Sequence, residues 1–278
     1  MKMKIFKPVS YVIILAIGLA MTFTSCEKTP EAMDLPPKES LSIDLNIFPS
    51  KTDKKAASEI ELNWFYSAAQ VFVWNGVLAL NMVIPLAAYA EAFNHVPVYQ
   101  EDNTWEWSYS VTSGVETYEA SLIGERLNNK EFSMKMYVSK SGVNPFEDVL
   151  WFSGVVRYDL TAASWKMNMD PYNTRPFMDI DYHKDFEAGT ADIKYTSTDP
   201  QSNVYGGFIE YGIDPALVDY DAHYTIQRSD TDLTEIKWNT TTAAGRVRDE
   251  VHYLDSDWHC WDTLLADVAC TEDESNSF

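Results

Sequence analysis

Basic residues are scarce in this chain: 21 lysines and arginines stand against 42 aspartates and glutamates, and the formal net charge of its 278 residues is −21. Nucleic-acid binding needs a basic surface that neutralises phosphates, and attachment to an anionic bilayer by charge needs one too. The composition therefore argues against both kinds of partner. An acidic, solubilising surface is enough to explain the charge.

The sequence also lacks the short motifs of common catalytic sites. Its five histidines show neither H-x-x-x-H nor H-E-x-x-H spacing: His95, His183, His223, His252 and His259. No P-loop and no G-x-S-x-G nucleophile elbow occurs. We therefore expect no metal and no cofactor, and a non-enzymatic protein is favoured over an enzyme.

The first 25 residues have the layout of a secretory signal peptide. Lys2, Lys4 and Lys7 precede an apolar run, Tyr11 to Phe23, that is followed by small residues. This run is shorter than the roughly 20 apolar residues that a transmembrane helix needs. Residues 1–25 are therefore predicted to direct export.

The signal ends in Phe23-Thr24-Ser25-Cys26, which resembles the lipobox of bacterial lipoproteins. The resemblance implies cleavage before Cys26, acylation of that cysteine and anchoring in the cell envelope, most simply at the outer membrane, facing the periplasm or the surface. The ending D-S-D-W-H-C-W-D is similar to endings of lipoproteins from Bacteroidota. The alternative is a secreted protein in which Cys26 is coincidental.

Residues 26–57 are rich in proline, serine and charge. Such a composition buries too little apolar surface to fold and predicts a flexible tether behind the anchor. The remaining residues, 58–278, are enough for one globular domain with a substantial core. We predict a single β-rich domain there, with helices at its start.

Cysteine is rare, and lipidation of Cys26 would leave Cys260 and Cys270 as a pair. An even pair in an exported protein predicts a disulfide. Two free thiols, or a metal site that includes the adjacent His259, are the alternatives.

Charge is absent from positions 64 to 90. Their length alone would permit a membrane span, but Pro85 breaks a helix, and polar residues such as Gln70 and Asn81 would be unsatisfied in hydrocarbon. We therefore predict two consecutive core helices near Ser58–Leu80 and Ile84–Phe93.

After His95, apolar and polar residues alternate, as in T-W-E-W-S-Y-S-V-T and E-F-S-M-K-M-Y-V-S. Period-two stretches separated by short turns predict about ten antiparallel strands. A sheet with one apolar face must cover it, and the helices are the other large apolar element. We predict a mainly β, α+β fold: a large curved antiparallel meander sheet, or an open barrel, packed on N-terminal apolar helices.

This order of elements is similar to that of the periplasmic lipoprotein carriers LolA and LolB. In that family a curved sheet encloses apolar helices, and the space between them takes up acyl chains. The resemblance is architectural, covers roughly residues 58–250, and implies no particular site residues.

Three groups of side chains are candidates for binding or chemistry. Exposed tryptophans could stack on sugars or line an apolar site; the candidates are Trp105, Trp107, Trp151, Trp165 and Trp238. Asp179 and Asp181 share a strand face and could bind a cation or share a proton. Asp214, Asp219 and Asp221 border an oxygen-rich loop without EF-hand spacing, so a solvated turn is favoured there.

The sequence favours a lipid-anchored, non-enzymatic envelope protein that binds an apolar ligand or an envelope partner. A surface glycan-binding accessory protein is one alternative. A hydrolase that uses Asp179 and Asp181 is the other.

Overall fold

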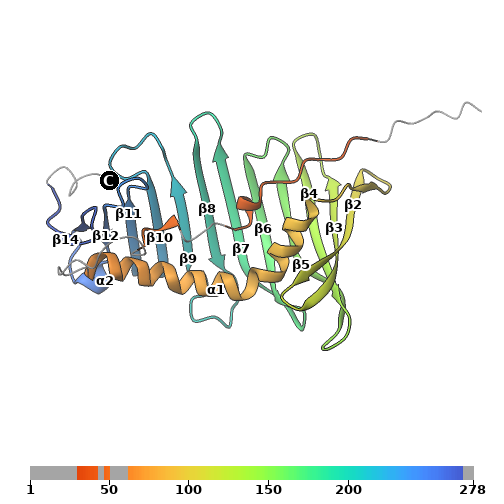
Figure 1. Ribbon diagram of the computed structural model, residues 1–278, viewed down its shortest axis with the longest axis horizontal. Helices are drawn as coiled ribbons and strands as arrows, with labels where there is room; N and C mark the ends of the chain where they lie inside the picture. Colours follow the sequence, from red (N-terminus) through yellow and green to blue (C-terminus); the bar gives the residue numbers. More distant parts are fainter. Residues whose placement is uncertain (1–29, 43–46, 51–61, 272–278) are drawn as a thin grey trace, which may run out of the picture. The chain divides into compact units, whose positions relative to one another are not determined.

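From Val98 to Val268 the chain builds one antiparallel sheet, in which every strand pairs with its neighbours in sequence (Figure 1). The computed structural model describes residues 30–42, 47–50 and 62–271. Within them, the first and last strands do not pair with each other, so the sheet stays open. The predicted class, mainly β with a curved antiparallel meander, is confirmed.

The sheet has fourteen strands, where the sequence predicted about ten. Three of the additional strands, β1, β13 and β14, have two or three residues and are too short to show alternation. The strands are β1 (Val98–Tyr99), β2 (Thr104–Ser113), β3 (Glu116–Arg126), β4 (Glu131–Lys140), β5 (Phe146–Arg157), β6 (Ala162–Asp170), β7 (Asn173–Asp185), β8 (Thr190–Ser197), β9 (Phe208–Ile213), β10 (Ala222–Ser229), β11 (Asp232–Trp238), β12 (Gly245–Arg248), β13 (His259–Trp261) and β14 (Asp267–Val268).

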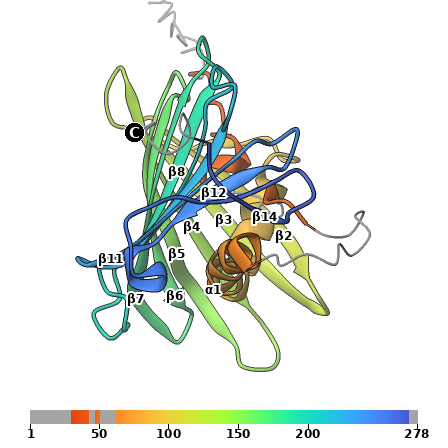
Figure 2. The same ribbon diagram turned by 90° about the vertical axis from the view of Figure 1, so that its left-hand side faces the viewer.

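Strict alternation gives the sheet one apolar face. On β2, Trp105, Trp107, Tyr109 and Val111 are buried, and the residues between them are more exposed. The same period continues through β3 and β4, because a register without bulges keeps equivalent positions on one side. The sheet curves so that this apolar face is concave (Figure 2).

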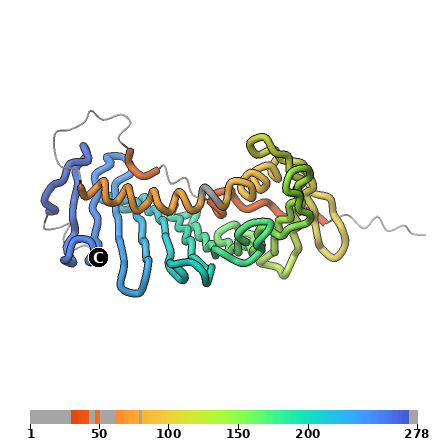
Figure 3. The backbone as a smooth tube through the Cα atoms, turned by 90° about the horizontal axis from the view of Figure 1, so that it is seen from below, coloured from red at the N-terminus to blue at the C-terminus, as the bar shows by residue number. Residues whose placement is uncertain are grey.

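One helix, α1 (Leu62–Ala92), lies along the concave face and crosses the strands from the C-terminal end of the sheet to its N-terminal end (Figures 1 and 3). Its inward side chains recur every three or four residues and join the core of the sheet; they include Trp64, Val71, Trp74, Leu78 and Met82. A second, four-residue helix, α2 (Glu250–Tyr253), connects β12 to β13.

The two consecutive helices predicted from the sequence are two arms of one continuous helix, and the predicted break is a bend. The structure has one helix whose two arms, Leu62–Leu78 and Asn81–Ala92, form an angle of 66°. The bend lies one turn before Pro85, because a proline ring removes the hydrogen bond to residue i−4 and collides with that carbonyl, here that of Asn81. No single straight helix among the described residues has the length and apolarity of a membrane span, whereas the two arms together meet those criteria.

The N-terminal segment (residues 31–42) also belongs to the folded unit, which begins at Glu31. Met33 and Leu41 are buried in the core. The Tyr89 hydroxyl of α1 donates a hydrogen bond to the Pro36 carbonyl over 2.6 Å, and a 3₁₀ turn, η1 (Lys38–Ser40), follows. The prediction of a flexible tether over residues 26–57 is therefore wrong for this segment. Its prolines keep it extended along the sheet, and its few apolar residues suffice to hold it there.

Replacing Leu41 by alanine tests whether this segment is structural. Leu41 is fully buried, so Leu41→Ala should lower the free energy of unfolding by about 2–4 kcal/mol. Leu217→Ala, at a side chain that is half exposed, is the matched control and should change it by less than about 0.5 kcal/mol. Denaturant unfolding measures both. Equal stability of the two variants would show that the segment does not contribute to the core.

Candidate functional site

The N-terminal arm of α1 is fixed to the C-terminal end of the sheet by polar contacts. The Asp267 carboxylate of β14 accepts hydrogen bonds from the backbone N–H groups of Leu62 and Asn63, at 3.1 and 3.0 Å. A carboxylate at a helix N-terminus satisfies free N–H groups and favours the helix dipole. The Asn63 side chain adds a bond to the Cys260 carbonyl at 3.1 Å. This end of the helix is therefore held by directional contacts.

Further along α1, a buried carboxylate organises a second polar contact. Asp249 is fully buried and accepts hydrogen bonds from the Tyr66 and Thr234 hydroxyls, each at 2.5 Å. Arg228 donates to the same carboxylate at 3.1 Å and to the Gln70 side-chain oxygen of α1 at 2.6 Å. We call these five residues the Asp249 cluster. It connects α1 to β10, β11 and the start of α2.

The electrostatics of the cluster follow from burial and hydrogen bonding. Burial raises the pKa of the Asp249 carboxyl, but hydrogen bonds from Thr234, Tyr66, His252 and Arg228 outweigh it, and the pKa lies below its ordinary value. Burial, followed by the bond to Asp249, raises the pKa of Tyr66 to about 12. Asp249 is therefore an anion at neutral pH and Tyr66 stays neutral as its donor. The arrangement is that of a satisfied structural network.

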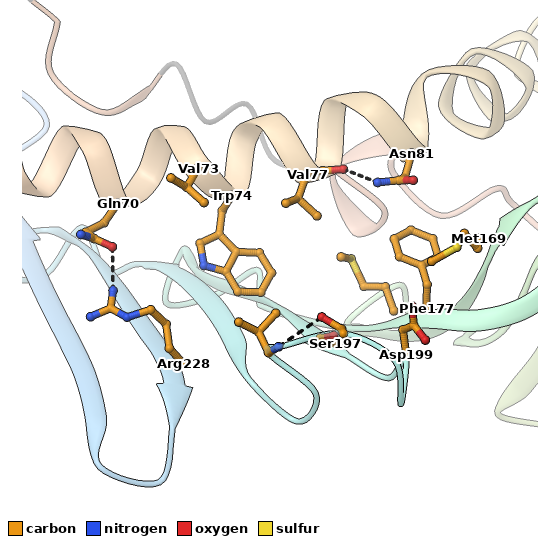
Figure 4. Close-up of a pocket in the computed structure, with 13 residues that line it drawn as sticks. Gln70, Val73, Trp74, Val77, Asn81, Met169, Phe177, Ser197, Asp199 and Arg228 are labelled. Atoms are coloured by element: carbon orange, nitrogen blue, oxygen red, sulfur yellow. Dashed lines mark hydrogen bonds between the residues drawn. The ribbon is translucent and has the colours of Figure 1, made fainter.

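Beyond this cluster, α1 and the sheet enclose an apolar cavity of about 240 Å³ (Figure 4). The helix contributes Val73, Trp74 and Val77, and the opposite wall is formed mainly by apolar side chains of β6 and β7. Polar groups lie at its margins. The full lining is Gln70, Val73, Trp74, Val77, Asn81, Met169, Phe177, Met178, Ser197, Asp199, Ser202, Val204 and Arg228.

A second cavity, of about 570 Å³, adjoins the first at the bend of α1. The two share Asn81 and Met169, so together they follow the helix from its N-terminal arm to its C-terminal arm. Lys140 and Trp151 line the second cavity, and the indole N–H of Trp151 has no hydrogen-bond acceptor among the described residues. We call the two cavities together the α1 groove. It is apolar under the first arm and more polar beyond the bend.

The five candidate tryptophans are core residues. Trp105, Trp107, Trp151, Trp165 and Trp238 are at most 4% exposed. Of these, only Trp151 lines the α1 groove. None offers the open, flat ring face on which a sugar stacks. These tryptophans therefore do not support the glycan-binding alternative.

Asp179 and Asp181 lie on the opposite, convex face of the sheet. There they border a shallow depression with Lys166, whose ammonium lies 3.2 Å from Asp179. An exposed ion pair of this kind is a common feature of a solvated strand face. Ser133, Ser153 and Ser164 also line this depression, and among the described residues no third carboxylate does.

The acidic loop is built as a turn. Asp214 accepts a hydrogen bond from the Ala216 N–H, and Asp221 accepts two from Thr240. Nowhere in the described ranges do three His, Cys, Asp or Glu side chains gather as metal ligands. At the end of the sheet, the sulfur atoms of Cys260 and Cys270 are 2.09 Å apart, the distance of a disulfide. Cys26 lies outside the described residues.

Neither a protein-family model, nor a curated protein, nor a solved structure matches this chain. The assignment of a function therefore depends on the site itself.

Sequence reasoning did not identify the residues of the α1 groove. Met169 and Met178 read as ordinary inward strand positions, because alternation shows which face a residue takes and not where the core leaves space. Phe177 directly precedes Met178 and is buried as well because the β6–β7 register shifts there, which alternation does not predict. The sequence indicated only weakly that Arg228 and Asp249 have a special role. Arg228 lies near the end of β10, and Asp249 directly follows β12.

Substitution of Asp249 tests the role of its cluster. Asp249→Asn removes an ionic acceptor that holds three side chains, and it should lower the free energy of unfolding at pH 7 by about 2 kcal/mol. Because the folded pKa of Asp249 is lowered, its contribution is complete above the ordinary carboxyl pKa of about 4 and is lost as the pH falls through the folded value. The difference between wild type and variant should therefore shrink in acid.

Denaturant unfolding from pH 7 to pH 2 measures this difference. Asp230→Asn, at an exposed turn, is the control and should behave like wild type. A difference that stays constant to pH 2 would contradict the assignment of the effect to the Asp249 charge.

Proposed function

We propose that this chain is a lipid-anchored, non-enzymatic protein of the bacterial cell envelope that holds an apolar ligand in the α1 groove. The observation that carries the proposal is the cavity between α1 and the concave face, with its apolar walls and few polar groups (Figure 4). Ligand sites in proteins are typically concave and mostly apolar, with a small number of polar groups that fix orientation.

The character of the walls selects the chemical class of the ligand. The side chains of Val73, Trp74, Val77, Phe177 and Met178 give the first cavity a mostly apolar wall, and the Trp74 indole nitrogen is the one polar side-chain atom among them. A flexible hydrocarbon chain gains by burial there, at about 0.8 kcal/mol per methylene. The length of the groove along the helix suits an extended chain better than a compact ring system. We therefore assign acyl chains as the ligand class.

Two sequence features support a place in the envelope. The signal peptide and Cys26 fit export and acylation, and several acyl chains provide stable anchoring. The order of elements is similar to that of LolA and LolB, in which acyl chains occupy the space between sheet and helices. In this chain the same space is the α1 groove.

Filling the groove should abolish uptake of a fatty acid. Val204 lines the first cavity from the β8–β9 loop and is partly exposed, so Val204→Trp places an indole inside without disturbing a strand. We expect its affinity for the fluorescent probe cis-parinaric acid to fall by about tenfold or more, which corresponds to about 1.4 kcal/mol.

Val218→Trp is the matched control, because Val218 is 85% exposed in the β9–β10 loop. It should bind the probe as wild type does, and both variants should unfold at the wild-type denaturant concentration. If wild type takes up no probe, and native mass spectrometry of protein from its host finds no bound lipid, the proposed function is wrong.

A further inference from the structure

The outer face of α1 is apolar as well as its inner face. Six large side chains on this face are exposed by 39% to 74%, and none of their neighbours on it is charged. We call them the α1 outer stripe: Leu62, Phe65, Phe72, Val73, Val77 and Val83. At about 100° per residue, the first five lie within an arc of about 140° on the first arm of α1, on the side away from Val71 and Leu78. Val83 lies beyond the bend.

A stripe of this kind requires an explanation. Single exposed apolar residues are normal, whereas a contiguous apolar patch of several hundred Å² marks an interaction site. Phe72 is 74% exposed and Phe65 is 66% exposed; neither has a hydrogen-bonding or charged group that would favour water. Leu62, Phe65 and Phe72 line neither cavity of the α1 groove.

We propose that the α1 outer stripe docks onto the hydrocarbon boundary of the membrane in which Cys26 anchors the chain. The anchor itself is part of the proposed function, and the docking deepens it. The covalent geometry of the chain is the first argument. Four residues lie between Cys26 and Glu31, where the folded unit begins, and the five residue steps between them reach at most about 18 Å. An acylated Cys26 therefore keeps the start of the unit close to the bilayer.

The position of the N-terminal segment is the second argument. Met33 packs against β3, with its sulfur 2.8 Å from the point that a Cβ on Gly124 would occupy. Pro36 is hydrogen-bonded to Tyr89 of α1. The segment therefore lies on the concave side of the sheet, the side on which α1 also lies (Figure 2). If the anchor holds the bilayer close to the concave side of the sheet, the bilayer can contact the outer stripe.

The distribution of charge is the third argument. Residues 64–90 carry no ionisable acid or base apart from tyrosine. The convex face carries ion pairs such as Lys166–Asp179 and Arg248–Glu235. Docking through the stripe therefore turns an uncharged helix surface to the membrane and leaves the ion pairs of the convex face in water, which limits repulsion between an acidic protein and anionic lipids.

Docking also connects the membrane to the α1 groove. Val73 and Val77 belong to the stripe and line the first cavity. When the stripe contacts lipid, the mouth of the groove opens next to hydrocarbon. An acyl chain can then pass between membrane and groove with little exposure to water.

An environment-sensitive fluorophore at the stripe tests the docking. Acylation would block Cys26, and Cys260 and Cys270 lie at disulfide distance, so Phe72→Cys would introduce a single reactive thiol for the fluorophore NBD. After reconstitution of the acylated protein into phosphatidylethanolamine–phosphatidylglycerol vesicles, we expect a blue shift and a severalfold increase in emission. Val155→Cys, at an apolar position of the convex face, is the matched control and should show neither change.

A second measurement separates docking from anchoring. The mature chain with Cys26→Ser should float with the same vesicles, and Phe65→Asp with Phe72→Asp should reduce flotation at least tenfold. Val115→Asp, at a 99% exposed turn position outside the stripe, should leave it unchanged.

The outcomes are distinct. Mass analysis that finds no acyl chains on Cys26 removes the anchor, and flotation of the unacylated chain then decides the docking alone. An acylated protein whose label at position 72 stays in water overturns the docking and leaves the anchor intact. A blue shift that depends on protein concentration without vesicles assigns the stripe to a second copy of the chain and also overturns the proposal.

Discussion

The structure depends on the burial of one face of an uncharged helix in a curved sheet. Neither element is stable alone in water: the sheet would expose a continuous row of tryptophan, tyrosine and methionine, and α1 would expose apolar residues on all sides. Packed together, their inner side chains form a single cluster. Burial of each large side chain contributes about 1.5–3 kcal/mol. The hydrophobic effect therefore determines the position of α1, and the hydrogen bonds of Asp267 and Asp249 determine its register along the strands.

The same constraint creates the site. A straight helix on a curved, twisted sheet cannot contact every strand equally, and Pro85 forces a bend of 66° between the two arms. Each arm packs closely at its own end of the sheet. Space remains in between, where Val73, Val77 and Asn81 face Met169 and Met178. The α1 groove therefore arises because a bent helix cannot fill the whole concave face of the sheet. Its walls are apolar because they are core side chains that the helix does not cover.

The sequence contained enough information for the architecture. Period-two alternation predicted an antiparallel meander with one apolar face, and the uncharged stretch from 64 to 90 identified its cover. Pattern could not decide between one bent helix and two, because Pro85 is compatible with either outcome. It also misjudged residues 31–42, where two buried side chains, Met33 and Leu41, outweigh a composition typical of a tether.

The alternation of apolar and polar residues could not predict the α1 groove, for a different reason. Alternation marks Trp105 and Met178 equally as inward residues, yet only Met178 lies beside a gap. The difference arises from the path of the helix across the sheet, a long-range property that no local window contains. Likewise, the exposure of Phe65 and Phe72 follows from the rotation of α1, which the distant contacts of Asn63 and Tyr66 determine.

Hydrogen–deuterium exchange on the Cys26→Ser chain, in buffer without detergent or lipid, tests most directly whether α1 is the sheltered core of this sheet. The account predicts that backbone amides from Val71 to Leu78 exchange as slowly as those of the central strands β6 and β7, because helix and sheet unfold together. Rapid exchange of these amides while β6 and β7 stay protected would contradict it, since the helix would then fold only when something else covers it.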